Sequence, residues 1–289
     1  MASTVTLKRR INSIKNTKQI TKAMELVSAS KMRQAQETAK LSRDYSKAAN
    51  ELLMTLSKVN EIKSHSFFTN RKVKQKLYIV ISSNSGLAGS YNYNVIKLLS
   101  GSIIKDRDLG LKPKVICIGK QGSNVISRLK GVDLLAVYNS FGDKPTANDI
   151  KPILNTVIDM YRSQEIDSVS IVYTLFVSNL VQNAVLENIL PIKPLDSTSA
   201  QIFTNFEPSP ETVLDYAVVR LIDAIIWQSI LESLASEHSM RMFAMRNATD
   251  NATDLISEYT LKFNTARQSG ITQELAEITG GSEALNTNS

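Results

Sequence analysis

The segment of this chain best suited to bind a ligand is a small-residue loop, SGLAGS, at residues 85–90. It follows an apolar run, which is where nucleotide-binding folds hold a phosphate. The loop lacks the Lys-Ser/Thr pair that reaches the terminal phosphates and magnesium, so a tight turn that needs small residues is the favoured interpretation. Gly119 and Gly122, after a second apolar run, give a weaker phosphate signal still.

The histidines and the cysteine do not form a catalytic or metal-binding set. The only two histidines are His65, in a basic connector, and His238, on a helical stripe. Neither a histidine-centred triad nor a zinc site is expected from them. The single Cys117 lies in the apolar run KVICIG, which favours a buried structural thiol and excludes a disulfide framework. We therefore predict no catalytic site, no cofactor and no metal.

Two long stretches without glycine or proline lie at the ends of the chain, at residues 1–85 and 211–269. Inside a helix, glycine costs roughly 1 kcal/mol and proline roughly 3 kcal/mol, so their absence permits two long helices. Ser209, Pro210 and Glu211 mark the start of the second helix, as a capping hydroxyl, a first-turn proline and an acid at the positive end of the helix dipole.

The second helix carries an apolar heptad stripe with one extra step of four residues between Leu234 and Met242. The stripe comprises Ala224, Trp227, Leu231, Leu234, His238, Met242, Met245, Thr249, Ala252, Ile256, Tyr259, Phe263 and Ala266. Such a pattern indicates a coiled coil with a local stutter. A helix of about 60 residues, at 1.5 Å per residue, is roughly 90 Å long, which is too long for an ordinary core-facing helix of a compact domain.

The first helix carries a less regular stripe. We predict that its seam comprises Ile20, Met24, Val27, Lys31, Gln34, Thr38, Leu41, Tyr45, Ala48 and Leu52. The three central positions are polar, so the seam drifts there or the pairing loosens. For this helix, an ordinary core-facing amphipathic helix remains an alternative.

The middle of the chain has the pattern of an α/β layer domain. Short, continuously apolar runs predict buried strands at residues 77–82, 114–119, 170–176 and 184–190. A helical pattern covers residues 150–161, so strand and helix alternate. The predicted fold class is α/β: a long antiparallel coiled coil of the terminal helices with a central α/β (Rossmann-like) layer domain. The predicted domains are 1–75 (helix and basic connector), 76–208 (α/β domain) and 209–289 (helix and polar tail).

The net charge of +7 is distributed unevenly. Residues 1–75 contain sixteen Lys and Arg against five acids, whereas residues 211–289 contain five bases against eleven acids. A basic helix can bind nucleic acid, and a nucleic-acid-binding coiled coil is the alternative function. A basic helix opposite an acidic one is also typical of a self-pairing hairpin. No apolar run reaches the roughly 20 residues needed to span a bilayer, and no signal peptide is expected.

The second predicted helix outlasts the first by roughly 15 residues, an overhang of about 20 Å. The overhang carries Ile271, Leu275 and Ile278 at helical spacing. No apolar partner for this stripe remains in the chain, so a second protein that supplies an apolar pocket or sleeve is expected.

Three segments identify a family. The opening INSIKNTKQITKAMELVSASKMRQAQ, the loop SSNSGLAGSYN and the ending ARQSGITQELAEITGG resemble the gamma subunit of bacterial F-type ATP synthase, over essentially the whole chain. The resemblance implies a central rotor shaft inside a ring of three alpha and three beta subunits. It also implies that the α/β domain lies at the foot, with the epsilon subunit and the membrane ring of c subunits. Proton flow would turn the shaft and drive ATP synthesis at catalytic sites in the ring.

The resemblance also implies which residues contact partners. Arg267, Gln268 and Thr272 match positions that engage the catalytic subunits, and Met24 matches a position on the first helix that faces them. By the same resemblance, Ile271, Leu275 and Ile278 would run in an apolar bearing. Ordinary packing for Met24, and a solvated face for Arg267 and Gln268, are the alternatives. The protein would bind no nucleic acid.

The chain departs from two groups of relatives. Chloroplast members carry an inserted cysteine pair for redox control, which a single Cys117 excludes. Mitochondrial members carry a presequence, for which Met1 to Leu7 leaves no room. The expected location is therefore the cytoplasmic side of a bacterial inner (plasma) membrane, with the chain attached peripherally and indirectly.

Overall fold

The structure is a computed structural model that describes residues 4–56, 66–69, 71–139, 145–146, 148–192 and 210–286. The chain forms two compact units. Unit 1 combines Met1–Val27 with Met242–Ser289, and unit 2 is Ser28–Arg241. The predicted division into three domains describes the chain by element type and stays a prediction.

Two long helices contribute to both units. Helix α1 spans Thr4–Leu56 and helix α5 spans Pro210–Asn286. The start of α5 at Pro210 confirms the predicted boundary, although Ser209 lies outside the described residues. Helix α5 continues through Gly280 to Asn286, past the predicted end near residue 279.

Unit 2 contains a five-stranded sheet in the order β3-β2-β1-β4-β5. The strands are β1 (Gln75–Ile81), β2 (Lys112–Ile118), β3 (Asp133–Tyr138), β4 (Ser168–Phe176) and β5 (Gln182–Leu190). The first four strands are parallel, and β5 is antiparallel to β4. The connecting helices are α2 (Tyr91–Asp108), α3 (Lys120–Ile126) and α4 (Lys151–Arg162).

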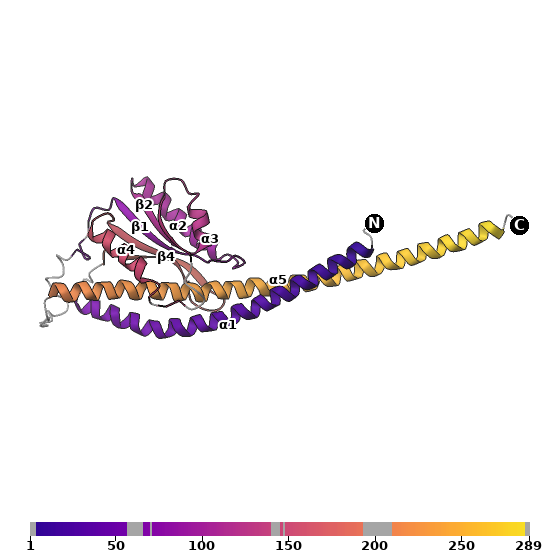
Figure 1. The fold of residues 1–289 in the computed structure, drawn as a ribbon, viewed down its shortest axis with the longest axis horizontal. Coiled ribbons are helices and arrows are strands. Elements are labelled where there is room, and N and C mark those ends of the chain that lie inside the picture. Colours follow the sequence, from indigo (N-terminus) through magenta and orange to yellow (C-terminus); the bar gives the residue numbers. More distant parts are fainter. Residues whose placement is uncertain are drawn as a thin grey trace. The chain divides into compact units, whose positions relative to one another are not determined.

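The two faces of the sheet are covered by different helices (Figure 1). On one face, alternate strand residues such as Ile79 and Ile171 pack with α4 and with the part of α5 that carries Leu214 to Ile230. On the other face, Tyr78, Val80 and their neighbours pack against α2 and α3. Burial of both faces explains why β1, β2 and β4 are apolar almost throughout. The α/β class is therefore confirmed, and so are the four predicted strands and the helix at residues 150–161. Strand β3 and helices α2 and α3 were not predicted.

Gly119 and Gly122 follow β2 because the chain there approaches Ser82 very closely. A Cβ at Gly119 would lie 2.1 Å from the Ser82 carbonyl oxygen, and Gly119 has a φ of +100°. A Cβ at Gly122 would lie 2.5 Å from Ser82 Oγ. Both positions need glycine for this close packing against Ser82, which accounts for them without a phosphate.

The stripe predicted for α5 is confirmed, because each of its positions is buried or half-buried. Its buried members include Ala224 and Leu231 in unit 2, and Met245, Thr249 and Ala252 in unit 1.

The seam predicted for α1 is displaced by about one residue from the buried stripe. Of its members, Met24, Lys31 and Thr38 are half-buried, and Leu52 lies outside the side chains that the structure describes. Ile20, Val27, Leu41 and Tyr45 are exposed, with Leu41 at 77%. The stripe that is buried or half-buried at every heptad position comprises Leu7, Ile11, Ile14, Lys18, Thr21, Glu25, Ser28, Met32, Ala35, Ala39, Ser42, Ser46 and Ala49. Serine and alanine dominate this stripe after residue 27. Small side chains allow close helix approach but give a weak hydrophobic signal, and the larger apolar residues one position away attracted the prediction.

Candidate partner-contact site

The far end of α5 presents three apolar side chains to solvent. Ile271, Leu275 and Ile278 are 49%, 59% and 70% exposed. Their spacing places them on one face of the helix. Every described α5 side chain from Ile271 onward is exposed, so no described residue of unit 1 covers this stripe. The structure therefore brings these three predicted contact residues together as one continuous apolar face.

The stripe is uncovered because α1 has already ended opposite it. Within unit 1, Arg10 Nη1 donates a hydrogen bond to the Tyr259 hydroxyl at 3.1 Å. Deeper in the pair, Thr249 Oγ1 donates to Thr21 Oγ1 at 2.8 Å. The two contacts define an antiparallel register in which Thr4, the first residue of α1, lies opposite about residue 265 of α5. The predicted overhang therefore begins close to Ala266.

Arg267, Gln268 and Thr272 lie at the root of this overhang. All three are exposed. Thr272 Oγ1 donates to the Gln268 carbonyl oxygen at 3.0 Å, so that hydroxyl is bonded within its own helix. The Arg267 guanidinium is a planar fork of N–H donors that can bind a carboxylate with two hydrogen bonds. The Gln268 amide can donate to or accept from a partner's backbone.

Met24 lies apart from the other predicted contact residues. It is half-buried on α1, close to the contact between Thr21 and Thr249. By the register of unit 1 it lies opposite about residue 246 of α5, which is about 30 Å along the helix from Arg267 at 1.5 Å per residue. The predicted partner-contact residues therefore form two separate surfaces.

The first turns of α1 form a positively charged surface. Its bases are Lys8, Arg9, Arg10, Lys15, Lys18 and Lys22. All are exposed except Lys18, which is half-buried. Lys22 Nζ forms an ion pair with Glu25 at 3.0 Å, and the Arg10 guanidinium lies 5.8 Å from the centroid of the Tyr259 ring. Charges exposed in this way act at a distance of about one Debye length, roughly 8–10 Å in cellular salt.

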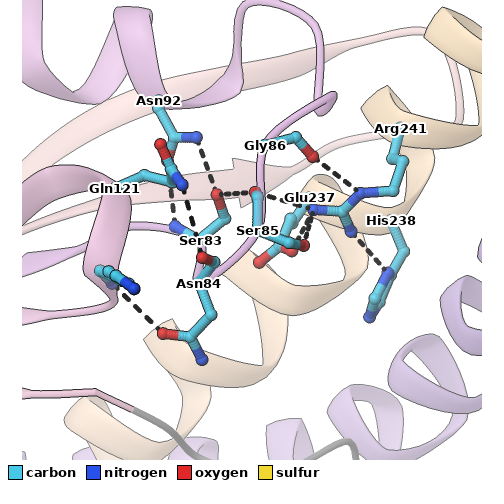
Figure 2. A network of polar contacts seen from close by, with 10 residues as sticks. Ser83, Asn84, Ser85, Gly86, Asn92, Gln121, Glu237, His238 and Arg241 are labelled. Atoms are coloured by element: carbon cyan, nitrogen blue, oxygen red, sulfur yellow. Dashed lines mark hydrogen bonds and ion pairs between the residues drawn. The ribbon is translucent and has the colours of Figure 1, made fainter.

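A buried polar network, which sequence reasoning missed, joins the loop after β1 to α5 in unit 2. Figure 2 shows the Arg241 side chain reaching from α5 to this loop. Arg241 Nη2 donates to the Ser85 carbonyl oxygen at 3.2 Å and to Ser85 Oγ at 2.9 Å, while Nε donates to the Gly86 carbonyl oxygen at 3.4 Å. The same guanidinium forms an ion pair with Glu237 at 2.7 Å and contacts His238 Nδ1 at 3.2 Å.

This charged pair is buried. Arg241 is 7% exposed and Glu237 is 8% exposed. Burial raises the pKa of Glu237, and the charge of Arg241 opposes that rise. Removing one partner of a buried pair leaves the other charge uncompensated, at a cost of about 3–5 kcal/mol.

The loop is also fixed from the side of the sheet. Ser83 N donates to Asn92 Oδ1 at 3.0 Å, and Asn92 Nδ2 donates to Ser83 Oγ at 2.7 Å. Ser83 Oγ donates to the Ser85 carbonyl oxygen at 2.7 Å, and Gln121 N donates to the Ser83 carbonyl oxygen at 2.9 Å. The loop is thus held by α2 and α3 on one side and by α5 on the other (Figure 2).

This loop is bonded to another part of the chain and does not have the geometry of a phosphate-binding loop. A phosphate-binding loop directs free backbone N–H groups at its ligand. Here the carbonyl oxygens of Ser85 and Gly86 face a guanidinium, and Ser83 N is already bonded to Asn92. The structure thus supports the interpretation of residues 85–90 as a tight turn, with Leu87 and Gly89 at φ values of +62° and +58°.

One sequence signal could have revealed this region. Glu237 and Arg241 are an i,i+4 pair of opposite charges, and they fall inside the stutter between Leu234 and Met242. A stutter shifts the stripe around the helix, and here the shifted turn carries a buried polar contact to the sheet domain.

The described part of the chain contains no group of three or more His, Cys, Asp or Glu side chains that could hold a metal ion. Cys117 is buried, and burial raises the pKa of its thiol to about 11, which leaves it protonated at neutral pH. Within the described ranges, no helix combines the length and the apolar composition needed to cross a membrane.

Comparisons with known proteins give a consistent result. A family model described as ATP synthase matches residues 3–285. The ATP synthase gamma chain of Xylella fastidiosa (strain M12) is 37% identical over 288 residues, covering 99% of this chain and 100% of the relative. The gamma chain of Stenotrophomonas maltophilia (strain K279a) has the same identity and coverage.

Solved structures share the fold at lower identity. A chain of the Euglena gracilis mitochondrial ATP synthase (OSCP/F1/c-ring) has a TM-score of 0.69 and 18% identity, covering 99% of this chain and 95% of that one. A chain of the Tetrahymena thermophila mitochondrial ATP synthase (central stalk/c-ring) has a TM-score of 0.62 and 22% identity, covering 79% of this chain and 99% of that one.

Proposed function

This chain belongs to the family of ATP synthase gamma chains, and from that premise we propose that it is the central rotor shaft of a bacterial F-type ATP synthase. The observation that carries the proposal is the overhang of α5, where Ile271, Leu275 and Ile278 form an exposed apolar face beyond the start of α1. A helix end of this kind is suited to turn inside an apolar sleeve supplied by other subunits.

The partners of the overhang are the alpha and beta subunits, arranged as a ring of three each. Ile271, Leu275 and Ile278 run in the apolar bearing of the ring. Arg267, Gln268 and Thr272 contact the catalytic subunits just below it, and Met24 makes a second contact from α1. The Euglena gracilis structure contains OSCP, F1 and the c-ring, and the Tetrahymena thermophila structure contains the central stalk and the c-ring, which supports a partnership of this kind.

The basic surface at the start of α1 faces acidic segments of the surrounding ring. Exposed charges attract at long range without a fixed geometry, so the attraction persists as the shaft turns. A nucleic-acid-binding role for the same surface receives no support from the comparisons, because the matching relatives are ATP synthase subunits.

The chain itself holds no catalytic site. A single asymmetric shaft in a three-fold ring presents a different face to each of three catalytic sites, so each site meets a different set of contacts. Turning the shaft then changes the nucleotide affinity of the sites in sequence. The α/β domain binds the epsilon subunit and the ring of c subunits, which places the chain peripherally at the cytoplasmic side of the inner (plasma) membrane.

Assembly with and without the overhang tests this proposal. The full chain, and a variant that lacks residues 267–289, would each be co-expressed with the alpha and beta subunits of the same bacterium. We expect one full-length chain per ring of three alpha and three beta subunits, with ATPase turnover, and weaker assembly or turnover for the truncated chain. A full-length chain that never joins the ring, and instead binds DNA with a steep salt dependence, would overturn the proposal.

A further inference from the structure

Helix α5 is attached to the sheet domain by two kinds of contact. From Leu214 to Ile230, its buried side chains are apolar and belong to the core beneath the sheet. From Ser233 to Arg241, the helix adds hydrogen bonds that join serine hydroxyls and the Arg241 guanidinium to the domain. Apolar contacts are non-directional, whereas hydrogen bonds fix an orientation. The second segment is therefore the one that sets the rotational position of the helix against the domain.

The directional contacts reach the carboxyl ends of two strands. Thr174 N, on β4, donates to Ser233 Oγ at 3.2 Å, and Ser236 Oγ donates to the Thr174 carbonyl oxygen at 3.2 Å. Ser239 Oγ donates to the Asn179 carbonyl oxygen, in the β4–β5 turn, at 2.9 Å. Arg241 continues the series to the loop after β1. We name these four α5 residues (Ser233, Ser236, Ser239 and Arg241) the polar clamp.

Arg241 makes the contacts in the clamp that carry a charge. Its guanidinium bonds two loop carbonyl oxygens and a loop hydroxyl while it is paired with Glu237. The guanidinium is planar and rigid. Because it is bonded to the loop and to Glu237 at the same time, it restricts movement of the loop relative to α5. A buried ion pair is weak evidence for net stability, and its best-attested use is to specify one arrangement over others.

We propose that Arg241 is a positioning residue that makes the loop at residues 83–89, and with it the carboxyl edge of the sheet, turn together with α5. The proposal rests on the rotor function above and adds the place where torsion passes between the helix and the α/β domain. Without the fork, the domain stays attached through its apolar core, but its angle about α5 becomes less well defined. Arg241 thus sets the torsional stiffness of this joint.

The test measures that stiffness in the assembled complex. The alpha/beta ring is fixed to a surface and a small bead is attached through a Leu109→Cys substitution, at an exposed residue after α2 in the sheet domain. Cys117 is buried and does not compete for the label. The variance of the bead angle, recorded with the shaft stalled, reports the stiffness between the ring and the domain. Rotation of the unsubstituted complex under ATP separately checks the rotor function itself.

Three variants distinguish the fork from its charge. Arg241→Gln is expected to increase the angular variance about two-fold. Arg241→Lys keeps the charge beside Glu237 but loses the fork, so it should also increase the variance, by less. Arg43→Gln is the matched control, because Arg43, on α1, pairs at 3.3 Å with Glu232 of α5 and is not bonded to the loop. Its variance should equal that of the unsubstituted complex.

A second measurement locates the effect. A spin label at Leu87→Cys, an exposed site at the loop tip, should become more mobile in the Arg241→Gln background and stay unchanged in the Arg43→Gln background. If Arg241→Gln does not assemble, Arg241→Lys decides the question by the same two measurements. Unchanged angular variance and unchanged loop mobility in the Arg241 variants, with a rotating unsubstituted complex, would overturn the positioning role and leave the rotor function intact.

Discussion

Helix α5 behaves differently in the two units. In unit 2, its residues Leu221, Ile222 and Ile226 are buried against the sheet and α4. In unit 1, the same helix has one partner helix, and its stripe ends with Ile271, Leu275 and Ile278 exposed. One continuous helix thus has a part whose apolar residues are buried within the chain and a part whose apolar stripe is exposed. The difference predicts that equal substitutions in the two parts will have unequal effects on folding and on assembly.

The largest expected effect is on folding, in unit 2. Ile226→Ala removes a fully buried side chain from the core and should lower the free energy of unfolding of the purified chain by about 2–5 kcal/mol. Urea denaturation, followed by circular dichroism, measures the change. The matched control is Ile278→Ala, which removes the same atoms from an exposed site and should change the free energy by less than about 0.5 kcal/mol. Equal effects of the two substitutions would contradict the comparison.

The next effect tests the seam of α1 in unit 2. Ala39 is buried at a small-residue position, so Ala39→Leu should overpack the helix contact and destabilise the chain by about 1–3 kcal/mol. Leu41→Ala, at an exposed position, should change the free energy by no more than about 0.5 kcal/mol. Thermal or urea unfolding of both variants measures this. The reverse order of effects would restore the seam predicted from the sequence.

The two seams also show what the sequence can predict and why the rest is hidden. In α5, the stripe is built from large apolar residues such as Leu231 and Met245, so periodicity identifies it. In α1, the buried positions after residue 27 are mostly serine and alanine, whose burial follows from close helix approach and leaves little pattern. Hydropathy therefore favoured the larger residues next to them.

In the sheet domain, too, some elements can be predicted from the sequence and others cannot. Strands buried on both faces, such as β1 and β4, are continuously apolar and were predicted within two residues. Strand β3 is an edge strand with mostly half-buried side chains, and α3 is a short helix that contains Gly122, so both lack a strong local signal. The contact between Arg241 and the loop joins residues 156 positions apart in the sequence, which no local pattern reveals.

Substitutions at the exposed end of α5 should impair assembly and leave the unfolding free energy unchanged, whereas substitutions in the core impair folding. Leu275→Asp combined with Ile278→Asp places two charges on the apolar face and should weaken assembly with the alpha/beta ring at least about ten-fold, equivalent to about 1.4 kcal/mol. The purified chain should keep its unfolding free energy, because both sites are exposed. Titration of the ring with labelled chain measures the affinity. Gln273→Asp, on the opposite face of the helix, is the control and should assemble normally.

The smallest effect concerns the hydroxyl pair that sets the register in unit 1. Thr249 is buried, and its hydroxyl donates to Thr21 Oγ1 at 2.8 Å. Thr249→Val keeps the shape but removes the hydroxyl, which contacts both Thr21 Oγ1 and the Met245 carbonyl oxygen at 2.8 Å, so it should cost about 0.5–1.5 kcal/mol. Thr265→Val is the control, because that hydroxyl is exposed and bonds only within its own helix. Hydrogen exchange of the amides around residue 249 measures the local change, since unit 1 should open more often before unit 2 does. If Thr249→Val accelerates exchange equally in the sheet strands, the two parts of α5 unfold as one cooperative body, and the distinction drawn from their burial does not extend to their stability.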